Sequence, residues 1–208
     1  MHSFSEADLE PVCNQLAKKD PAIKRILQQY GYPPLWTRKP SFETLIHIIL
    51  EQQVSLASAK AALVKLKEKL GLVTAARLLP LTDAELRACY FSRQKTGYAR
   101  CLANAVCAKQ LSIGKLRHCS DKEVREALTA IKGIGNWTVD VFLMMALHRR
   151  DLFPVGDIAL VNSIRHEKAW PHATKEEILA LAENWRPNRT VAAYIFWHAY
   201  LRRKNISY

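Results

Sequence analysis

The fold of this chain is decided by residues 128–138, which read LTAIKGIGNWT. Two glycines flank a single apolar residue, and apolar residues at helical spacing lie on both sides, so the stretch predicts two helices joined by a tight hairpin. A glycine at position 133 or 135 permits a backbone conformation that a side chain would obstruct, and it lets a ligand approach the backbone closely. Ile134, between them, is expected to pack inward and hold the two helices together.

The same hairpin has the features of a phosphate-binding site. The second helix is expected to start near Asn136, so that amide groups from Gly133, Gly135 and their neighbours converge at the positive end of a helix. A phosphate held there positions a protein on DNA without reading its bases. We assign this role to Gly133, Gly135, Lys132 and Thr138, with a plain structural turn as the alternative.

A second informative segment, LFPVGDIAL, covers residues 152–160. Pro154 interrupts the preceding helix, and Asp157 stands where the next helix would start. Aspartate is strongly favoured as a helix N-cap, which is the structural interpretation of this residue. That role can coexist with a chemical one.

Helical patterns continue through the whole chain, and no window shows the alternation that is typical of a strand. Capping boxes, in which two side chains satisfy orphan amides reciprocally, mark three helix starts. They are Thr82–Glu85, Ser120–Glu123 and Thr174–Glu177. The predicted helices span residues 6–17, 21–30, 42–51, 56–70, 74–79, 83–89, 93–111, 121–131, 136–149, 157–169, 175–184 and 189–203. The predicted fold class is therefore all-α.

The chain is strongly basic, with 31 Lys and Arg against 19 Asp and Glu and a formal net charge of +12. Two stretches, residues 87–117 and 185–208, contain basic residues and no acidic ones, and together they hold as many positive charges as the net excess. Like charges this concentrated repel one another, so a polyanionic partner is expected to neutralise them. Nucleic acid fits this expectation, and a basic solubility surface is the alternative.

Membrane and disulfide-rich classes are disfavoured. The sequence does not begin with a charged segment and an apolar run, and no stretch approaches the ~18 apolar residues of a membrane span, so we expect neither secretion nor a membrane partner. The five cysteines are an odd number with no close pair. They predict free thiols in a reducing compartment, with no disulfide framework and no metal site.

Residues 128–160 resemble the helix-hairpin-helix, with the loop and aspartate that follow it, of the HhH-GPD superfamily of base-excision DNA glycosylases. Within it they are similar to the 3-methyladenine DNA glycosylase II (AlkA-type) branch. Residues 42–55, FETLIHIILEQQVS, resemble the helix, loop and wedge region of that branch. Residues 185–197, WRPNRTVAAYIFW, resemble its C-terminal helix. The resemblance covers most of the chain from about Ser41 onward.

The resemblance implies that Asp157 is catalytic. In the family this aspartate is essential for breaking the bond between base and sugar, and a carboxylate suits that step because positive charge develops on the sugar. Bifunctional relatives have a lysine in the first turn after the hairpin, where this sequence has Trp137, whereas Lys132 precedes the first glycine. We therefore expect a monofunctional enzyme without abasic-site lyase activity. No cysteine follows Cys119, which excludes the iron–sulfur branch.

The resemblance also implies residues for base flipping and base binding. A target base must leave the duplex before a pocket can read it, and Gln53 matches the wedge that fills the gap. A polar loop residue that caps the next helix is the alternative for Gln53. Trp137 and Trp197 match aromatic positions of the alkyl-base pocket, where a cationic base stacks on a π face, with core packing as the alternative. No cofactor is expected, with a monovalent or divalent cation at the hairpin backbone as the one candidate.

These inferences combine into an all-α fold of two helical lobes with the active-site cleft between them. One lobe joins residues 1–40 with 151–208, and the middle lobe, 41–150, ends in the helix-hairpin-helix at 128–149. The expected function is hydrolytic release of alkylated bases such as N3-methyladenine from double-stranded DNA, by a monomer in the cytoplasm and nucleoid or in a nucleus. The alternatives are a glycosylase for uracil, hypoxanthine or an oxidised purine, a non-catalytic helix-hairpin-helix module, and a basic helical interaction protein.

Overall fold

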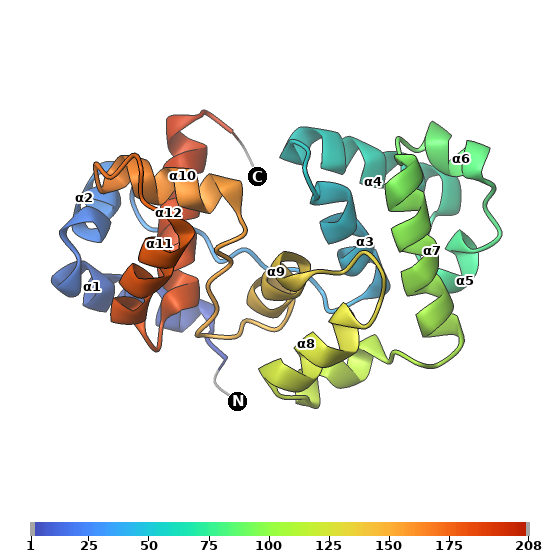
Figure 1. The fold of residues 1–208 in the computed structure, drawn as a ribbon, viewed down its shortest axis with the longest axis horizontal. Coiled ribbons are helices and arrows are strands. Elements are labelled where there is room, and N and C mark those ends of the chain that lie inside the picture. The colour runs from blue at the N-terminus through green and yellow to red at the C-terminus, as the bar shows by residue number, and fades with distance from the viewer. Residues whose placement is uncertain (1–2, 207–208) are drawn as a thin grey trace. The chain divides into compact units, whose positions relative to one another are not determined.

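The structure is a computed structural model that describes residues 3–206, and within that range it contains helices and turns but no strand. The prediction of an all-α fold is confirmed. The chain divides into two compact units. The first unit joins the residues up to Thr37 with those from Leu143 onward, and the second comprises Arg38–Phe142. Figure 1 shows the helices that make up each unit.

The helices are distributed between the units as follows. The first unit contains α1 (Glu6–Lys19), α2 (Pro21–Tyr30), α10 (Ile158–Glu167), α11 (Lys175–Ala182), the short 3-10 helix η2 (Glu183–Trp185) and α12 (Arg189–Arg203). The second contains α3 (Phe42–Glu51), α4 (Leu56–Leu70), α5 (Ala75–Leu78), α6 (Asp83–Ala88), α7 (Arg93–Cys107), the 3-10 helix η1 (Ile113–His118) and α8 (Asp121–Thr129). Helix α9 (Asn136–Ala146) includes residues of both units.

Helix starts follow the local signals of the sequence. All twelve predicted ranges contain an α-helix, and each of the three predicted capping boxes is formed. Asp20 accepts a hydrogen bond from the Ala22 N–H at 2.9 Å and so caps α2, with Pro21 at the first helical position. These signals are reliable because a cap and the amide that it satisfies lie within three residues of each other.

Helix ends were predicted less well. Helix α7 ends at Cys107 and α9 at Ala146, each several residues before the predicted end. Lys109 and His148 have φ values of 59° and 51°, and Ala169 beyond α10 has a φ of 50°. A right-handed helix cannot continue through a residue with a left-handed backbone. The identity of a lysine, histidine or alanine does not indicate that conformation, so the sequence did not predict these helix ends. The helices η1 and η2 were not predicted.

The first unit is built around α12, which contacts α1, α2 and α10. Tyr194 of α12 is fully buried, and its hydroxyl donates to the Met144 carbonyl at 3.0 Å. This bond attaches the last turn of α9 to the first unit. The division between the units therefore falls at Phe142 and Leu143, inside α9, and not at the position after residue 150 where the sequence analysis placed it.

The second unit is built around α3, in which eight of the ten residues are buried. Helix α3 packs against α4 and α7. Glu51, at its end, is buried and accepts two hydrogen bonds from the Arg38 guanidinium at 2.6 and 2.9 Å. Burial of each large aliphatic side chain contributes roughly 1.5–3 kcal/mol, so the position of α3 and of the loop that follows it is fixed by the core.

Candidate active site

The predicted helix-hairpin-helix is formed by α8, the turn after it and α9. Ile134 in the turn is buried, and its N–H donates to the Ile131 carbonyl at 3.1 Å. Arg125 of α8 donates to the Asn136 side chain at 3.0 Å and forms an ion pair with Asp140, both on α9. Ile134 is thus packed inward as expected, and an ion pair joins the two helices.

The two hairpin glycines differ in what requires them. Gly133 has a φ of 95°, and a Cβ built there would overlap the ring of Tyr98 from α7. Gly135 has no left-handed backbone, and a Cβ built there meets no atom within 4 Å. The prediction that a side chain would be obstructed is therefore confirmed for Gly133 and wrong for Gly135, where the space beside the backbone is open.

The amide groups of the hairpin lie at the N-terminus of α9. The first-turn amides of a helix have no carbonyl partner within it, and the Val139 N–H makes the first helical bond, to the Gly135 carbonyl at 3.1 Å. Lys132 is exposed in the turn. Thr138 is only 1% exposed, and its hydroxyl accepts a hydrogen bond from Gln52. The Thr138 hydroxyl is therefore used within the protein.

Asp157 caps α10, as its position predicted. Its Oδ1 accepts the Leu160 N–H at 2.8 Å and the indole N–H of Trp197 at 3.0 Å. The side chain is half-buried, and the N-terminus of α10 favours a negative charge beside it. Because the two donors come from α10 and α12, two helices of the same unit orient this carboxylate.

Trp197 lies in an aromatic cluster of the first unit. Its ring is stacked on Tyr194, with 5.9 Å between ring centroids, and meets Trp36 edge-on at 6.3 Å. Only 8% of Trp197 is exposed. The ring is therefore packed in the core of the first unit, and its place in the base pocket stays a prediction. Its polar edge makes a hydrogen bond to Asp157 that the sequence pattern did not predict.

Trp137 is half-buried and is the second residue of α9, in the first turn after the hairpin. The predicted site residues fall into two sets, one in each unit. The second unit holds Gln53, Lys132, Gly133, Gly135, Trp137 and Thr138, and the first unit holds Asp157 and Trp197. Asp157 and Trp197 are joined directly by a hydrogen bond.

Gln53 is exposed in the turn between α3 and α4, and its φ of 57° lies in a region that residues other than glycine seldom adopt. The N-cap of α4 is Ser55, whose hydroxyl accepts the Ser58 N–H at 3.2 Å. The alternative in which Gln53 caps the next helix is therefore wrong.

Sequence reasoning missed Gln52, the residue before the predicted wedge. Its side-chain amide donates to the Gly133 carbonyl at 2.9 Å and to the Thr138 hydroxyl at 3.0 Å. Two adjacent glutamines in a loop look alike in a sequence. Their opposite environments, one half-buried against the hairpin and one exposed, appear only in the fold.

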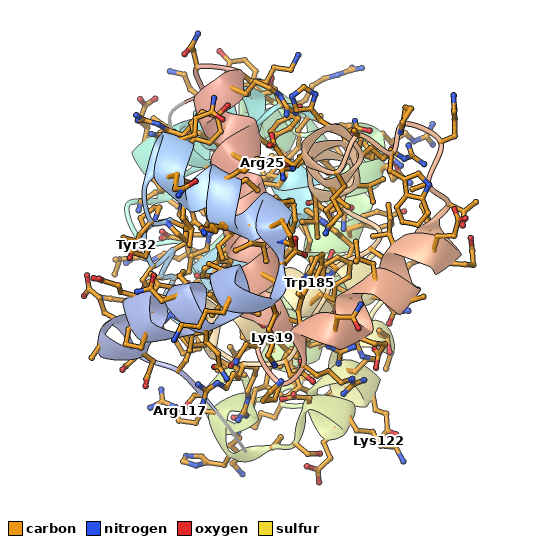
Figure 2. The ribbon with its side chains drawn as sticks, turned by 90° about the vertical axis from the view of Figure 1, so that its left-hand side faces the viewer. Lys19, Arg25, Tyr32, Arg117, Lys122 and Trp185 are labelled. Carbon is orange, nitrogen blue, oxygen red and sulfur yellow. The ribbon has the colours of Figure 1, made fainter. Side chains whose placement is uncertain are left out.

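Ion pairs within the protein neutralise part of the positive charge of the two basic stretches. Arginines of both stretches pair with acids from outside them, in the ion pairs Arg100–Asp83, Arg186–Glu183, Arg189–Asp151 and Arg203–Glu167. Arg25 of α2, labelled in Figure 2, also has an internal partner, the Glu167 carbonyl at 2.8 Å. Arg93 and Lys204 are exposed and have no ion pair within residues 3–206, so a basic surface remains.

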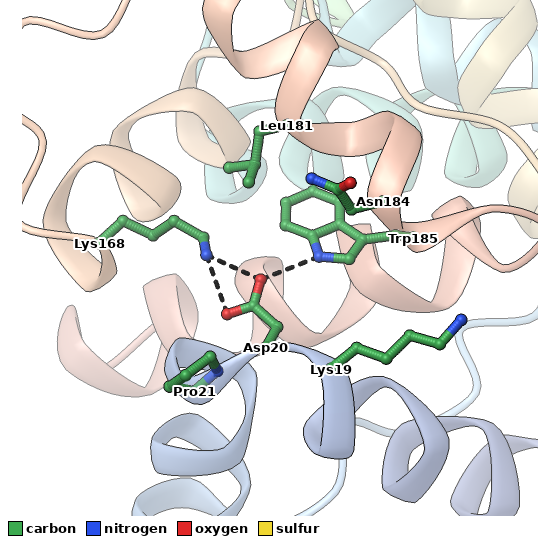
Figure 3. Close-up of a pocket in the computed structure, with 7 residues that line it drawn as sticks. All are labelled: Lys19, Asp20, Pro21, Lys168, Leu181, Asn184 and Trp185. Atoms are coloured by element: carbon green, nitrogen blue, oxygen red, sulfur yellow. Dashed lines mark hydrogen bonds and ion pairs between the residues drawn. The ribbon is translucent and has the colours of Figure 1, made fainter.

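A pocket of about 310 Å³ lies in the first unit, and none of the predicted site residues lines it (Figure 3). The Asp20 carboxylate in it accepts two hydrogen bonds from Lys168, at 2.7 and 2.9 Å, and one from the Trp185 indole at 2.9 Å. Burial alone would raise the pKa of Asp20, but the bonds and charge of Lys168 hold it below its usual value. The polar groups satisfy one another, so we interpret this pocket as part of the packing of α1, α2 and η2.

No group of three or more His, Cys, Asp or Glu side chains that could hold a metal ion occurs in the part of the chain that the structure describes. A cation at the hairpin would have to use backbone carbonyls. The carbonyls of Ile131 and Gly133 each accept one hydrogen bond already, and a carbonyl oxygen has a second lone pair, so the hairpin is compatible with such a cation. Within residues 3–206, none of the helices has the length and apolar character needed to span a membrane.

Comparison with known proteins identifies the family. The chain matches the family model described as HhH-GPD superfamily base excision DNA repair protein over residues 46–187. DNA-3-methyladenine glycosylase 1 of Schizosaccharomyces pombe is 30% identical over 190 residues, which are 88% of this chain and 83% of that protein.

Solved structures agree with the family model. The S. pombe 3-methyladenine DNA glycosylase in complex with abasic DNA has a TM-score of 0.81 at 28% identity, over 90% of this chain and 95% of that chain. The DNA-3-methyladenine glycosidase of Bacillus halodurans has a TM-score of 0.77 at 29% identity, over 99% and 95%. The superfamily predicted from the hairpin and Asp157 is confirmed. This chain therefore belongs to the HhH-GPD superfamily of base excision DNA repair proteins.

Proposed function

We propose that this protein is a monofunctional DNA glycosylase that hydrolyses the bond between an alkylated base, such as N3-methyladenine, and its deoxyribose in double-stranded DNA. The observation that carries the proposal is the carboxylate of Asp157, held by the Leu160 N–H and the Trp197 indole in a member of this superfamily. Two relatives, the DNA-3-methyladenine glycosylase 1 of S. pombe and the DNA-3-methyladenine glycosidase of B. halodurans, support the class of base by their names.

Asp157 supplies the negative charge that the reaction needs. When the bond from C1′ to the base nitrogen breaks, its electron pair leaves with the base and positive charge develops on the sugar. The oxygen of a water molecule then bonds to C1′, and its proton passes to the carboxylate or to solvent. Because two hydrogen bonds already orient Asp157, it needs little reorganisation as the charge develops. Such stabilisation commonly contributes several kcal/mol, about a hundredfold or more in rate.

The alkylated base itself favours this mechanism. A purine alkylated at a ring nitrogen is cationic and departs as a neutral base, so its departure requires no acid to protonate it. A cation also stacks favourably on an electron-rich indole face. We assign this stacking to Trp137, which is half-buried at the start of α9. Trp197 is almost fully buried and serves the site by holding Asp157.

The absence of a suitable amine is the basis for proposing no lyase activity. Strand cleavage requires an amine that forms a Schiff base with C1′ of the sugar. The residue in the first turn after the hairpin is Trp137, whose indole nitrogen cannot do so. Lys132 precedes Gly133 in the chain and is exposed, and we assign it to phosphate binding.

DNA binding is proposed to use the second unit. The amides around Gly133 and Gly135, with Lys132, hold a phosphate, and a cation on the hairpin carbonyls would add positive charge there when bound. Gln53 enters the space that the flipped base leaves, which offsets part of the few kcal/mol that flipping costs. A monomer acting in the cytoplasm and nucleoid, or in a nucleus, is sufficient for this activity.

The test is base release from duplexes that each carry one lesion: N3-methyladenine, uracil, hypoxanthine or 8-oxoguanine. We expect release of the alkylated base in single-turnover reactions and an intact strand until alkali is added. Release of another base alone would contradict the proposed lesion class. Tight binding to abasic DNA without release of any base would favour a non-catalytic module, and neither binding nor release would favour a basic interaction protein.

A further inference from the structure

We infer that Gln52 is a positioning residue that couples the phosphate-binding hairpin to the loop presenting Gln53, an inference that rests on the proposed wedge role of Gln53. Gln52 is the C-cap of α3, and its side-chain amide has two N–H donors. It donates to the Gly133 carbonyl at 2.9 Å and to the Thr138 hydroxyl at 3.0 Å. One side chain therefore connects the end of α3 to both the turn and the second helix of the hairpin.

Helix α7 provides a second connection between the same elements. The Lys95 ammonium donates to the Leu50 carbonyl at 2.6 Å, and Leu50 lies in the last turn of α3, where carbonyls have no partner within the helix. Tyr98, one turn further along α7, packs directly on Gly133. Residues three apart share a face of a helix, so this face of α7 contacts both the end of α3 and the hairpin.

The backbone of the loop explains why such anchoring matters. Gln53 has a left-handed φ of 57° and an exposed side chain. A residue other than glycine keeps this conformation only where its surroundings impose it. Gln52 is fixed immediately before it, and Ser55, two residues after it, is fixed by its bond to the Ser58 N–H. The loop that presents Gln53 is thus fixed at both ends, and the hairpin fixes the end at Gln52.

The hydrogen bonds of Gln52 therefore link phosphate binding by the hairpin to opening of the target base pair. When the hairpin binds a phosphate, Gln52 sets the position of Gln53 relative to that phosphate. Loss of this link should impair opening of a paired base and leave the excision of an unpaired base almost unchanged, because an unpaired base is already open. A purely structural role would impair both substrates equally.

The first experiment compares Gln52→Met with Gln94→Met. Methionine has a similar length and no donor, and Gln94 is a control because it also bonds to a residue beside the hairpin, the Tyr98 hydroxyl, at 2.6 Å. We expect Gln52→Met to slow excision from paired duplexes about tenfold or more, because both hydrogen bonds of the Gln52 amide are lost. Excision from single strands should stay within about twofold, and Gln94→Met should change neither rate.

The second experiment is a double-mutant cycle with Gln53→Ala. If Gln52 acts through Gln53, adding Gln52→Met to Gln53→Ala should slow paired-base excision by no more than about twofold. Multiplied losses in the double variant, or equal losses on paired and unpaired substrates, would overturn the inference. Should Gln52→Met lower the melting temperature strongly, Thr138→Val removes one of the two acceptors with little change in volume, and the same ratio is measured.

A fluorescent readout separates this inference from the proposed function. A 2-aminopurine at the target position brightens when it leaves the base stack, whether or not a base is released. If the wild-type protein releases no base from the lesion duplexes but increases the fluorescence of the probe, the proposed function fails. A smaller increase in fluorescence with Gln52→Met than with the wild-type protein would still support the coupling. If the wild-type and Gln52→Met proteins brighten it equally, the coupling is contradicted.

Discussion

The indole N–H of Trp197 donates to Oδ1 of Asp157 across 3.0 Å, and the same oxygen accepts the N–H of Leu160. The Trp197 ring is packed against Trp36 and Tyr194 and is 8% exposed, so its direction is set by the core of the first unit. The orientation of the candidate catalytic carboxylate therefore depends on core packing as well as on its own helix.

Trp197→Phe tests this relationship. Phenylalanine keeps an aromatic ring in the cluster but cannot donate to Asp157, and hydrogen bonds to charged groups contribute roughly 1.5–3 kcal/mol. We expect the single-turnover excision rate to fall about ten- to a hundredfold, with binding to abasic DNA unchanged. Trp36→Phe is the control, because it alters the same cluster without removing the bond to Asp157. Equal rate losses in the two variants would show that the bond has no special role.

The two hairpin glycines should respond differently to alanine. In Gly133→Ala the new Cβ overlaps Tyr98 at a left-handed φ, so we expect a loss of about 1–3 kcal/mol in the free energy of unfolding, measured by denaturant titration. In Gly135→Ala the space is open, and stability should change by less than about 0.5 kcal/mol. DNA affinity should nevertheless fall in Gly135→Ala, because the methyl group occupies the approach to the backbone. Unchanged affinity in Gly135→Ala would argue against a phosphate there.

The features that the sequence predicted correctly are local ones. The hairpin, the capping boxes and the cap at Asp157 each depend on residues a few positions apart, whose chemistry and spacing are visible in the chain. The contacts that the sequence did not predict join distant positions, 86 residues apart for Gln52 and Thr138 and 40 for Asp157 and Trp197. Charge counting pointed to a nucleic-acid partner but did not show which basic residues are paired within the protein, because Arg189 finds its acid at Asp151, outside its own acid-free stretch.

Gln53→Ala should weaken excision of paired lesions more than excision of lesions in single strands or mismatches. The wedge offsets a flipping cost that is smaller where pairing is already lost. We expect about a tenfold loss on paired duplexes, which corresponds to roughly 1.4 kcal/mol, and little change on single strands. The two single-turnover rates are measured in parallel at one salt concentration, since DNA binding depends on salt. Equal losses on the two substrates would remove Gln53 from the wedge role.

The absence of lyase activity can be tested without knowing the preferred lesion. Incubation with abasic-site DNA and borohydride should give no covalent protein–DNA adduct above that of an unrelated basic protein, because Trp137 offers no amine for a Schiff base. Trp137→Lys is the complementary variant, in which an adduct should form if the first turn of α9 faces the sugar. A strong wild-type adduct that disappears when one lysine is replaced would contradict the monofunctional assignment.

The most direct test of the proposed chemistry is the single-turnover excision rate of Asp157→Asn on a duplex with one alkylated base. Asparagine is as good an N-cap as aspartate and can still accept the Leu160 N–H, so the start of α10 should be preserved while the negative charge is lost. We expect the rate to fall by about a hundredfold or more, with binding to an abasic-site analogue within a few-fold of wild type. Retention of most of the wild-type rate would contradict the catalytic role of Asp157.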